Sequence, residues 1–445
     1  MVFRNQWAIA TMRLLLDCLH ASGDLEVQLV GQEPRHSASS KVALELSDSA
    51  AVWQLLLNPE LALGELFTDE RLTLKKGDLI QLIELVAPRL SSLSASLPGK
   101  IWTSARRART VLTGPNTKQR ARRYIAHHYD LDARLYPLFL DADRQYSCAY
   151  FDRADSTLDE AQLAKKRHLA AKLLIRPSHR ICDIGCGWGG LALYLAEMCD
   201  AKVCGVTLSK EQLTIARERA KRRGLDKLVE FRLQDYRGVG DVFDRIVSVG
   251  MFEHVRPRRY PTFFRAVSAM LADDGLMVLH SIGRSDGPSP TNPWIAKHIF
   301  PGGYIPALSE VVPLIESTGL IITDVEILRG HYARTLNAWR QNFLSRRDEA
   351  ESLYGNRFCR LWEFYLAVAE AAFRYFGLVV FQIQIAKKHA QVPLTRDYIG
   401  ECERALRIRE LSSHSTPHVA ASAFARRASL SNLGAQDSCG TVEVL

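Results

Sequence analysis

The stretch that most constrains the fold of this chain is HRICDIGCGWGGLALYLAEM, from His179 to Met198. Residues 181–184, apolar except for Asp183, predict a short buried strand, glycines follow at 185, 187, 189 and 190, and leucines then recur at helical spacing. A strand, a glycine turn and a helix in this order let backbone N–H groups and a helix N-terminus approach a ligand closely. We therefore expect a small-molecule site at the carboxyl end of this strand.

The residues around the turn indicate which ligand binds there. Gly185, Gly187 and Gly190 fit the G-x-G-x-x-G spacing of dinucleotide sites. Asp183, however, places a carboxylate beside the turn, which would attract a cationic amino-acid ligand and repel a pyrophosphate. The second predicted strand also ends in Thr207 rather than in the acidic residue that binds the ribose of NAD. The pattern favours S-adenosylmethionine over NAD, and a glycine turn that only packs a helix on a strand is the structural alternative.

Strands and helices alternate along the rest of this region. Further strands are expected at 202–208, 228–233, 244–249, 276–282, 320–327 and 378–385, with helices over 157–175, 210–223, 309–317 and 335–375. This alternation predicts an α/β fold with a doubly wound, mostly parallel, seven-stranded sheet of the class I methyltransferase type. Such sheets bind ligands at the carboxyl ends of their strands. The side chains expected there are Asp183, Thr207, Gln234, Asp235, Glu253 and His280.

At 445 residues the chain is too long for one ordinary domain. We expect a smaller N-terminal α+β domain over residues 1–95 that docks on lipid or membrane, and a linker over 96–117 rich in Ser, Gly, Pro and Arg. The catalytic domain is expected over 118–400, followed by a tail over 401–445 that is disordered from about residue 412. The N-terminus lacks a signal-peptide pattern, and the apolar runs are too short to span a bilayer.

Charge and cysteine content point to the surroundings of the protein. Basic residues outnumber acidic ones by 58 to 49, and no acidic residue lies between Leu90 and Tyr129. That basic stretch is either a solvated face or a surface for anionic membrane or nucleic acid, and the lack of a nucleic-acid motif favours membrane. Nine cysteines without a Cys-x-x-Cys pair indicate reduced thiols in a cytoplasmic protein. His127 and His128 lack a third ligand, so no metal site is expected.

A series of motifs in one order carries a family resemblance. They are HHYDL (127–131), YSCAYF (146–151), DIGCGWGG (183–190), GVTLSKEQ (205–212), QDYR (234–237), FDRIVSVGMFEHV (243–255), LHSIG (279–283), IFPGG (299–303) and HYARTLNAW (331–339). With them the chain resembles the cyclopropane-fatty-acyl-phospholipid synthases, a family that includes the mycolic acid cyclopropane synthases and related S-adenosylmethionine-dependent lipid methyltransferases. LNPELALGELFTDERL (57–72) also resembles the N-terminal domain of the phospholipid-acting members.

The resemblance implies a reaction and its partners. The methyl carbon of S-adenosylmethionine would be added to a cis double bond of an unsaturated phospholipid acyl chain to give a cyclopropane, with bound bicarbonate as general base. A lipid C-methyltransferase that gives a methyl- or methylene-branched chain is one alternative, and a non-catalytic lipid- or cofactor-binding relative is another. The implied partner is phospholipid in an anionic membrane surface, with the enzyme peripheral on the cytoplasmic face. Nucleic acid is not expected, and a homodimer is left open.

The resemblance also assigns the site residues. The side chains of Glu253, His280 and Tyr332 and the backbone at Cys148 and Ile282 would hold the bicarbonate. The S-adenosylmethionine residues would be Asp183, Gly185 and Gly187 at the amino-acid end, Tyr146 and Ser147 over the methionine part, Thr207 and Gln212 at the ribose, and Gln234 and Asp235 at the adenine. Relatives often carry a cysteine at the position matched by Ala369. If the reaction required a covalent thiolate at this position, the chain would be inactive.

Overall fold

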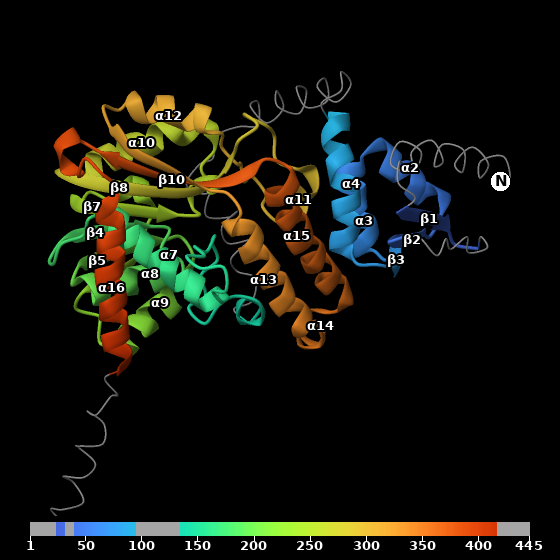
Figure 1. The fold of residues 1–445 in the computed structure, drawn as a ribbon, viewed down its shortest axis with the longest axis horizontal. Coiled ribbons are helices and arrows are strands. Elements are labelled where there is room, and N and C mark those ends of the chain that lie inside the picture. Colours follow the sequence, from blue (N-terminus) through green and yellow to red (C-terminus); the bar gives the residue numbers. More distant parts are fainter. Residues whose placement is uncertain (1–23, 32–39, 95–133, 416–445) are drawn as a thin grey trace, which may run out of the picture.

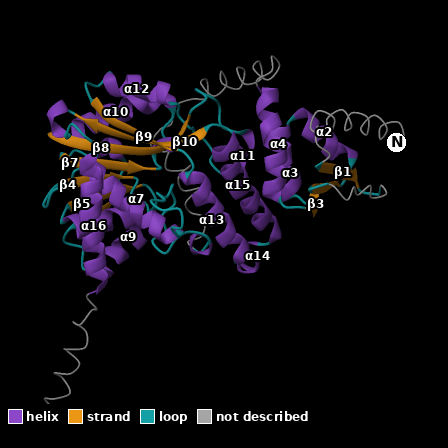
Figure 2. Ribbon diagram, viewed as in Figure 1, coloured by secondary structure: helices purple, strands orange, loops and turns teal. Residues whose placement is uncertain are grey.

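The computed structural model describes residues 24–31, 40–94 and 134–415 (Figure 1). The predicted linker over 96–117 and the HHYDL motif lie outside these residues. So do the basic residues between Lys100 and Arg123. The described part of the chain forms a large α/β unit and a small sheet with its own helices (Figure 2).

A seven-stranded sheet forms the centre of the large unit, with the strand order β6-β5-β4-β7-β8-β10-β9. Its strands are β4 (Arg180–Ile184), β5 (Lys202–Thr207), β6 (Val229–Leu233), β7 (Phe243–Val249), β8 (Leu271–Arg284), β9 (Ile321–Leu328) and β10 (Leu378–Ala386). The five neighbouring strands β6, β5, β4, β7 and β8 pair in parallel, whereas β10 lies antiparallel between β8 and β9. The prediction of a mostly parallel, doubly wound sheet of seven strands is confirmed.

Helices cover both faces of this sheet (Figure 1). On one face lie α7 (Leu158–Lys172), α8 (Gly190–Cys199), α9 (Lys210–Arg222) and α16 (Asp397–Ser415), and on the other lie α10 (Tyr260–Met270) and α12 (Leu308–Glu316). Successive residues of β4 point to opposite layers, as expected for a strand buried on both sides. Ile181 packs into the core under α8, and Cys182 and Ile184 pack into the core under α10.

Three helices stand beside the sheet where a single helical stretch over 335–375 was expected. They are α13 (His331–Ser345), α14 (Arg347–Tyr354) and α15 (Asn356–Tyr375). The break before α15 falls at Gly355, whose φ of 79° is accessible to glycine at little cost. The chain then runs from α15 directly into β10, so this helical layer positions the strand that completes the sheet.

The small sheet consists of β1 (Leu25–Leu29), β2 (Val42–Leu46) and β3 (Leu72–Lys76), with α2 (Ser49–Leu57), α3 (Pro59–Thr68) and α4 (Leu79–Ser94) around it. Helices α3 and α4 pack against α15, and α3 also packs against α11 (Pro293–His298). Gly64 of α3 lies so close to Trp294 and Phe364 that a Cβ there would be 2.3 Å from Trp294 Nε1. The small sheet is therefore docked on the helical layer that leads into β10.

Residues 401–415 of the predicted tail belong to α16, so the prediction of disorder from about residue 412 is wrong for residues 412–415. The reason is a buried ion pair. Glu410 accepts hydrogen bonds from Arg167 Nη2 at 2.8 Å and from the Tyr194 hydroxyl at 2.6 Å. These contacts join α16 to α7 and α8, so the helix belongs to the large unit.

Candidate active site

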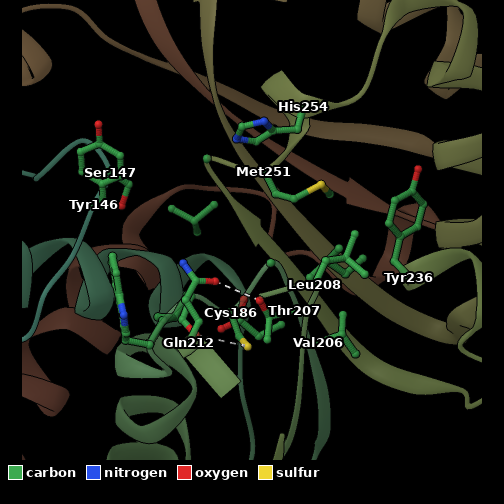
Figure 3. Close-up of a pocket in the computed structure, with 18 of the residues that line it drawn as sticks. Tyr146, Ser147, Cys186, Val206, Thr207, Leu208, Gln212, Tyr236, Met251 and His254 are labelled. Carbon is green, nitrogen blue, oxygen red and sulfur yellow. Dashed lines mark hydrogen bonds between the residues drawn. The ribbon is translucent and has the colours of Figure 1, made fainter. Parts of the chain in front are cut away.

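A cavity opens at the carboxyl ends of β4, β5, β6 and β7 (Figure 3). All nine residues that we predicted to bind S-adenosylmethionine line it. They are Tyr146, Ser147, Asp183, Gly185, Gly187, Thr207, Gln212, Gln234 and Asp235. They come from four separate segments, and the parallel pairing of β4, β5 and β6 brings three of these segments to one edge of the sheet.

The glycine turn between β4 and α8 needs glycine for two separate reasons. Gly185 has a φ of 85°, and a Cβ on it would lie 2.7 Å from the side chain of Met251, another cavity residue. Gly187 and Gly189 also have positive φ values, of 55° and 81°. The turn therefore holds its backbone against the cavity in a conformation that residues with side chains rarely adopt.

Asp183 is the buried acid at the end of β4. Its Oδ2 atom has no hydrogen-bond partner among the described residues. Burial raises the pKa of Asp183 to about 7, and the nearby Lys165 ammonium opposes that rise. A buried carboxylate that lacks a partner and borders a cavity fits the ammonium group of an amino-acid ligand.

The polar residues on the far side of the cavity are held by short-range hydrogen bonds. The Thr207 hydroxyl donates to Gln212 Oε1 at 2.9 Å, and Gln234 Nε2 donates to the Gly238 carbonyl at 2.7 Å. Asp235 accepts two hydrogen bonds from the guanidinium of Arg237, at 2.8 and 2.6 Å. These contacts fix the side chains before any ligand binds.

Tyr146 and Ser147 close the cavity from the loop that precedes α7 (Figure 3). The Tyr146 hydroxyl lies 2.9 Å from that of Tyr365, and its ring stacks on Trp339. The Ser147 hydroxyl accepts a 2.8 Å hydrogen bond from Lys165, a lysine of α7 that is completely buried. Burial lowers the pKa of Lys165 to about 8, although Asp141 opposes the decrease.

The five predicted catalytic residues, the second group of the site, are not among the residues that line this cavity. Glu253 follows β7 in a short 3-10 turn, and its Oε1 accepts a 2.7 Å hydrogen bond from the backbone N–H of Ile282 on β8. Its Oε2 is buried and has no partner among the described residues. Burial raises the pKa of Glu253 to about 7.

His280 lies two residues before Ile282, so both side chains point to the same face of β8. His280 is buried, and its Nδ1 lies 3.1 Å from Nε2 of Gln382. Burial lowers the pKa of its imidazole, and the positive charges of Lys165 and Lys172 lower it further. The ring is therefore neutral at physiological pH.

Tyr332 and Cys148 belong to a large apolar cluster that extends through the helical layer. Both are buried, and Ile282 packs against the same apolar cluster. The Tyr332 ring lies 4.7 Å from that of Phe373 between centroids. The Ala149 N–H donates to the Thr335 hydroxyl at 3.0 Å, which ties the Cys148 segment to α13. Burial raises the pKa of the Cys148 thiol, so it is not ionised at neutral pH.

Some cavity residues were missed at the level of sequence. His254 follows Glu253 directly and lines the cavity, and burial lowers its pKa to about 4. Met251, Tyr236 and Arg259 line it as well. Tyr236 lies inside the QDYR motif, and Met251 and His254 lie inside FDRIVSVGMFEHV. Their position in these motifs, rather than their residue type, was the signal that could have identified them.

The sequence model of the mycolic acid cyclopropane synthetase family matches residues 116–383 of this chain. The chain belongs to this family. It is 40% identical over 297 residues to the cyclopropane-fatty-acyl-phospholipid synthase of Escherichia coli K12, a match that covers 67% of this chain and 76% of the relative. It is 38% identical over 280 residues to the tuberculostearic acid methyltransferase UfaA1 of Mycobacterium tuberculosis, covering 60% of this chain and 65% of the relative.

Solved structures agree with this family assignment. The mycolic acid cyclopropane synthase CmaA1 complexed with SAH and CTAB superposes with a TM-score of 0.57 at 32% identity, over 59% of this chain and 97% of CmaA1. The predictions of the family, of the class I methyltransferase fold and of a methyltransferase that uses S-adenosylmethionine are confirmed. Within the described ranges, no helix has both the length and the apolar composition needed to cross a membrane.

Proposed function

We propose that this enzyme transfers the methyl carbon of S-adenosylmethionine to a cis double bond of an unsaturated phospholipid acyl chain and closes a cyclopropane ring. The observation that carries the proposal is the pair of adjoining sites at the carboxyl edge of the sheet. One is a cavity whose acid suits an amino-acid ligand, and the other is the Glu253 carboxylate, in the turn after β7, which is bonded to β8, the strand that carries the imidazole of His280. The Escherichia coli relative named above supports the substrate class.

The cavity residues would bind S-adenosylmethionine by charge and by shape. Asp183 would pair with its ammonium group, and the turn at Gly185 and Gly187 would bring the backbone close to the ligand. Thr207 and Gln212 would contact the ribose, and Gln234 and Asp235 the adenine. Tyr146 and Ser147 would cover the methionine part, which aims the sulfonium methyl toward the neighbouring group.

The second group suits a small oxyanion such as bicarbonate. The buried Oε2 of Glu253 lacks a partner among the described residues and would accept a hydrogen bond from the hydroxyl of bicarbonate, and His280 and Tyr332 would offer a ring N–H and a hydroxyl to its other oxygens. Once bound there, bicarbonate would supply the base that accepts a proton from the added methyl carbon. The Ile282 N–H is already donated to Glu253, so its proposed contribution is to orient that carboxylate. The backbone at Cys148 would close the cage.

The chain's own side chains would carry the rest of the chemistry. Carbocation character on the acyl chain would be stabilised by the face of an aromatic ring such as that of Tyr332, whereas Phe252, also expected to help, is buried against Tyr260 in the core under α10. The apolar cluster around Cys148 and Tyr332 would exclude water, which would otherwise trap that cation as an alcohol. Membrane docking by residues 1–95, an anionic surface, the cytoplasmic location and a homodimer stay predictions. Trp53 and Leu57, exposed one turn apart on α2, support a lipid-facing role for the small domain.

A lipid C-methyltransferase is the second candidate function. The tuberculostearic acid methyltransferase relative supports it, because the same site would give a branched chain if the proton left from a different carbon. A non-catalytic relative is disfavoured by the presence of both groups of site residues.

Incubation with methyl-labelled S-adenosylmethionine and vesicles of a cis-monounsaturated phospholipid tests the proposal. We expect a product one methylene heavier whose proton NMR spectrum shows the high-field ring signals of a cyclopropane. Vesicles of the saturated lipid serve as the control. A branched or methylenated product would establish the second candidate. Removal of bicarbonate should slow turnover reversibly, and a rate indifferent to bicarbonate would argue for a side-chain base.

A further inference from the structure

His280 is the inner end of a chain of buried polar contacts that the proposed reaction does not use. Its Nδ1 lies 3.1 Å from the side-chain nitrogen of Gln382 on β10, and the Gln382 oxygen accepts a 2.8 Å hydrogen bond from the ammonium of Lys172 on α7. All three side chains are at least 98% buried. They join three elements, because β10 pairs with β8 and α7 covers the sheet.

The order of donors and acceptors in this chain is determined by Lys172. An ammonium group has donors and no acceptor, so the atom of Gln382 that faces it must be the carbonyl oxygen. The NH₂ group of Gln382 then faces His280 and can only donate. Nδ1 of His280 must therefore be the bare acceptor nitrogen, and the ring proton must be on Nε2.

Lys172 is itself held in place by acids from the neighbouring strand. It forms ion pairs with Glu326 and Asp324 of β9. Glu326 also lies 2.7 Å from Nε2 of His168, whose Nδ1 lies 2.7 Å from Glu403 of α16. The pKa of His280 is affected by four charged or titratable groups, namely Lys165, His168 and Lys172 of α7 and Glu326 of β9.

We propose that Gln382, oriented by Lys172, is a positioning residue that holds His280 in the Nε2–H form, so that the ring presents a hydrogen-bond donor to an anion. The proposal rests on the proposed function in one respect, namely that His280 contacts an oxyanion. Neither Gln382 nor Lys172 was singled out from the sequence.

The other tautomer would be costly in this arrangement. A proton on Nδ1 would face the NH₂ group of Gln382, and rotating the amide to avoid that clash would turn NH₂ toward the Lys172 ammonium. Either arrangement places two donors against each other in a buried site, where unsatisfied polar groups are expensive. The bare Nε2 would also repel the oxygens of a bound anion.

Gln382→Glu should reverse the preferred tautomer of His280 while the shape of the side chain at position 382 stays nearly the same. A carboxylate accepts from Lys172 and also from a proton on Nδ1, so the neutral ring would lose its Nε2 proton. We expect kcat of the variant to fall about 100-fold or more at mildly alkaline pH, as happens when a catalytic histidine holds the wrong tautomer. As the pH falls, the doubly protonated ring would regain the Nε2 donor. The plot of kcat against pH should therefore show a fall at alkaline pH, the alkaline limb, that the unmodified enzyme lacks.

Gln384→Glu is the matched control. Gln384 is a buried glutamine on the same strand, and it donates to the Lys172 carbonyl and the Tyr398 hydroxyl rather than to His280. This variant should lose stability from its new buried charge without gaining the alkaline limb. The same limb in both variants would overturn the proposal, because it would then come from any carboxylate on β10.

The protonation of each ring nitrogen of His280 can be measured in the full-length protein by ¹⁵N NMR after histidine labelling. The His280 signals are assigned by their loss in His280→Asn. We expect a protonated Nε2 and a bare Nδ1 in the unmodified chain, and a protonated Nδ1 in Gln382→Glu. A protonated Nδ1 in the unmodified chain would overturn the proposal even if the variant fails to fold. A turnover rate that does not depend on bicarbonate would contradict bicarbonate as the proposed base. The proposal on the His280 tautomer would still be decided by this NMR spectrum.

Discussion

The backbone N–H of Ile282 donates a 2.7 Å hydrogen bond to Oε1 of Glu253, and this contact joins the acid after β7 to the strand that carries His280. One carboxylate oxygen is thereby anchored, while the other is buried without a partner among the described residues. The acid is held in position by the protein and keeps one oxygen for a ligand.

Glu253→Gln should therefore separate binding from chemistry. The amide oxygen can still accept from Ile282, so the side chain stays in place, but the charge and one acceptor are lost. We expect kcat to fall about 100-fold or more, in line with the loss of a preorganised partner of the reacting groups. Calorimetry should show S-adenosylmethionine binding close to that of the parent enzyme. A parental kcat would remove Glu253 from the proposed mechanism.

Ligand binding should depend on pH through Asp183. Its pKa is about 7 in the folded chain, and only the ionised form pairs with an ammonium group. The affinity for S-adenosylmethionine should therefore decrease as the pH falls from about 8 to about 6. Asp183→Asn should bind more weakly and lose this dependence. A parental pH profile in Asp183→Asn would exclude this role for the carboxylate.

The same pKa shift has a consequence for stability. The ordinary pKa of Asp183 is 3.8, so between about pH 4 and about pH 7 the folded chain holds a proton that the unfolded chain has released. The contribution of Asp183 to the free energy of unfolding thus decreases as the pH rises through this range. Thermal unfolding without ligand should show a smaller loss of Tm over this range in Asp183→Asn than in the parent chain.

Cys148→Ala should retain most of its activity. Burial raises the pKa of the thiol, which makes it a poor nucleophile, and its proposed role is carried by the backbone. We expect kcat within about threefold of the parent, with the remaining loss due to the missing side-chain volume. Methyl transfer to vesicles provides the measurement. Loss of activity at unchanged Tm would indicate a covalent step that this chain is not expected to use.

The ion pair between Arg167 and Glu410 should make α16 essential for stability. Deletion of residues 401–445 would break the buried pair of Arg167 with Glu410 and uncover the side of α7 that α16 covers, at a cost of about 3 kcal/mol in the free energy of unfolding. Deletion of residues 416–445 alone retains the pair and should leave Tm close to that of the full chain. Equal Tm values for the two deletions would show that α16 contributes nothing to stability.

Gly64→Val should weaken the docking of the small sheet, because its side chain would overlap Trp294 and Phe364. We expect a loss of about 1–3 kcal/mol, together with faster limited proteolysis within residues 1–95. Gly240→Ala is the control, since a Cβ there meets nothing within 4 Å. If Gly64→Val unfolds like the parent, the contact with α11 and α15 is not tight in solution.

The cofactor side of the site was predictable because its residues follow successive parallel strands. Asp183, Thr207 and Gln234 each stand where a strand ends, and the sheet order alone brings them to one edge. The capping box of Thr157 and Glu160 at the start of α7 likewise follows a local sequence signature, because its hydrogen bonds join residues three apart. Both patterns depend on residues close together in the chain or on the repeat of the fold.

The polar core behind His280 could not be predicted in this way. The segment LAKKRHLAAK of α7 is rich in basic residues, a type that is usually exposed to solvent, yet Lys165, Lys166 and Lys172 are all buried. Their partners come from segments far away in the sequence, such as Asp143 and Glu326. The burial of these lysines is determined by tertiary contacts, which the periodicity of the local sequence does not indicate.

The position of β10 has a consequence for the order in which the protein can fold during synthesis. This strand is inserted between β8 and β9, both of which leave the ribosome earlier. Until β10 emerges, β8 is an open edge and β9 has no partner in the sheet, so a nascent chain exposes a long apolar strand to other chains. Nascent or prematurely terminated chains should therefore be the form of this enzyme that most needs chaperones.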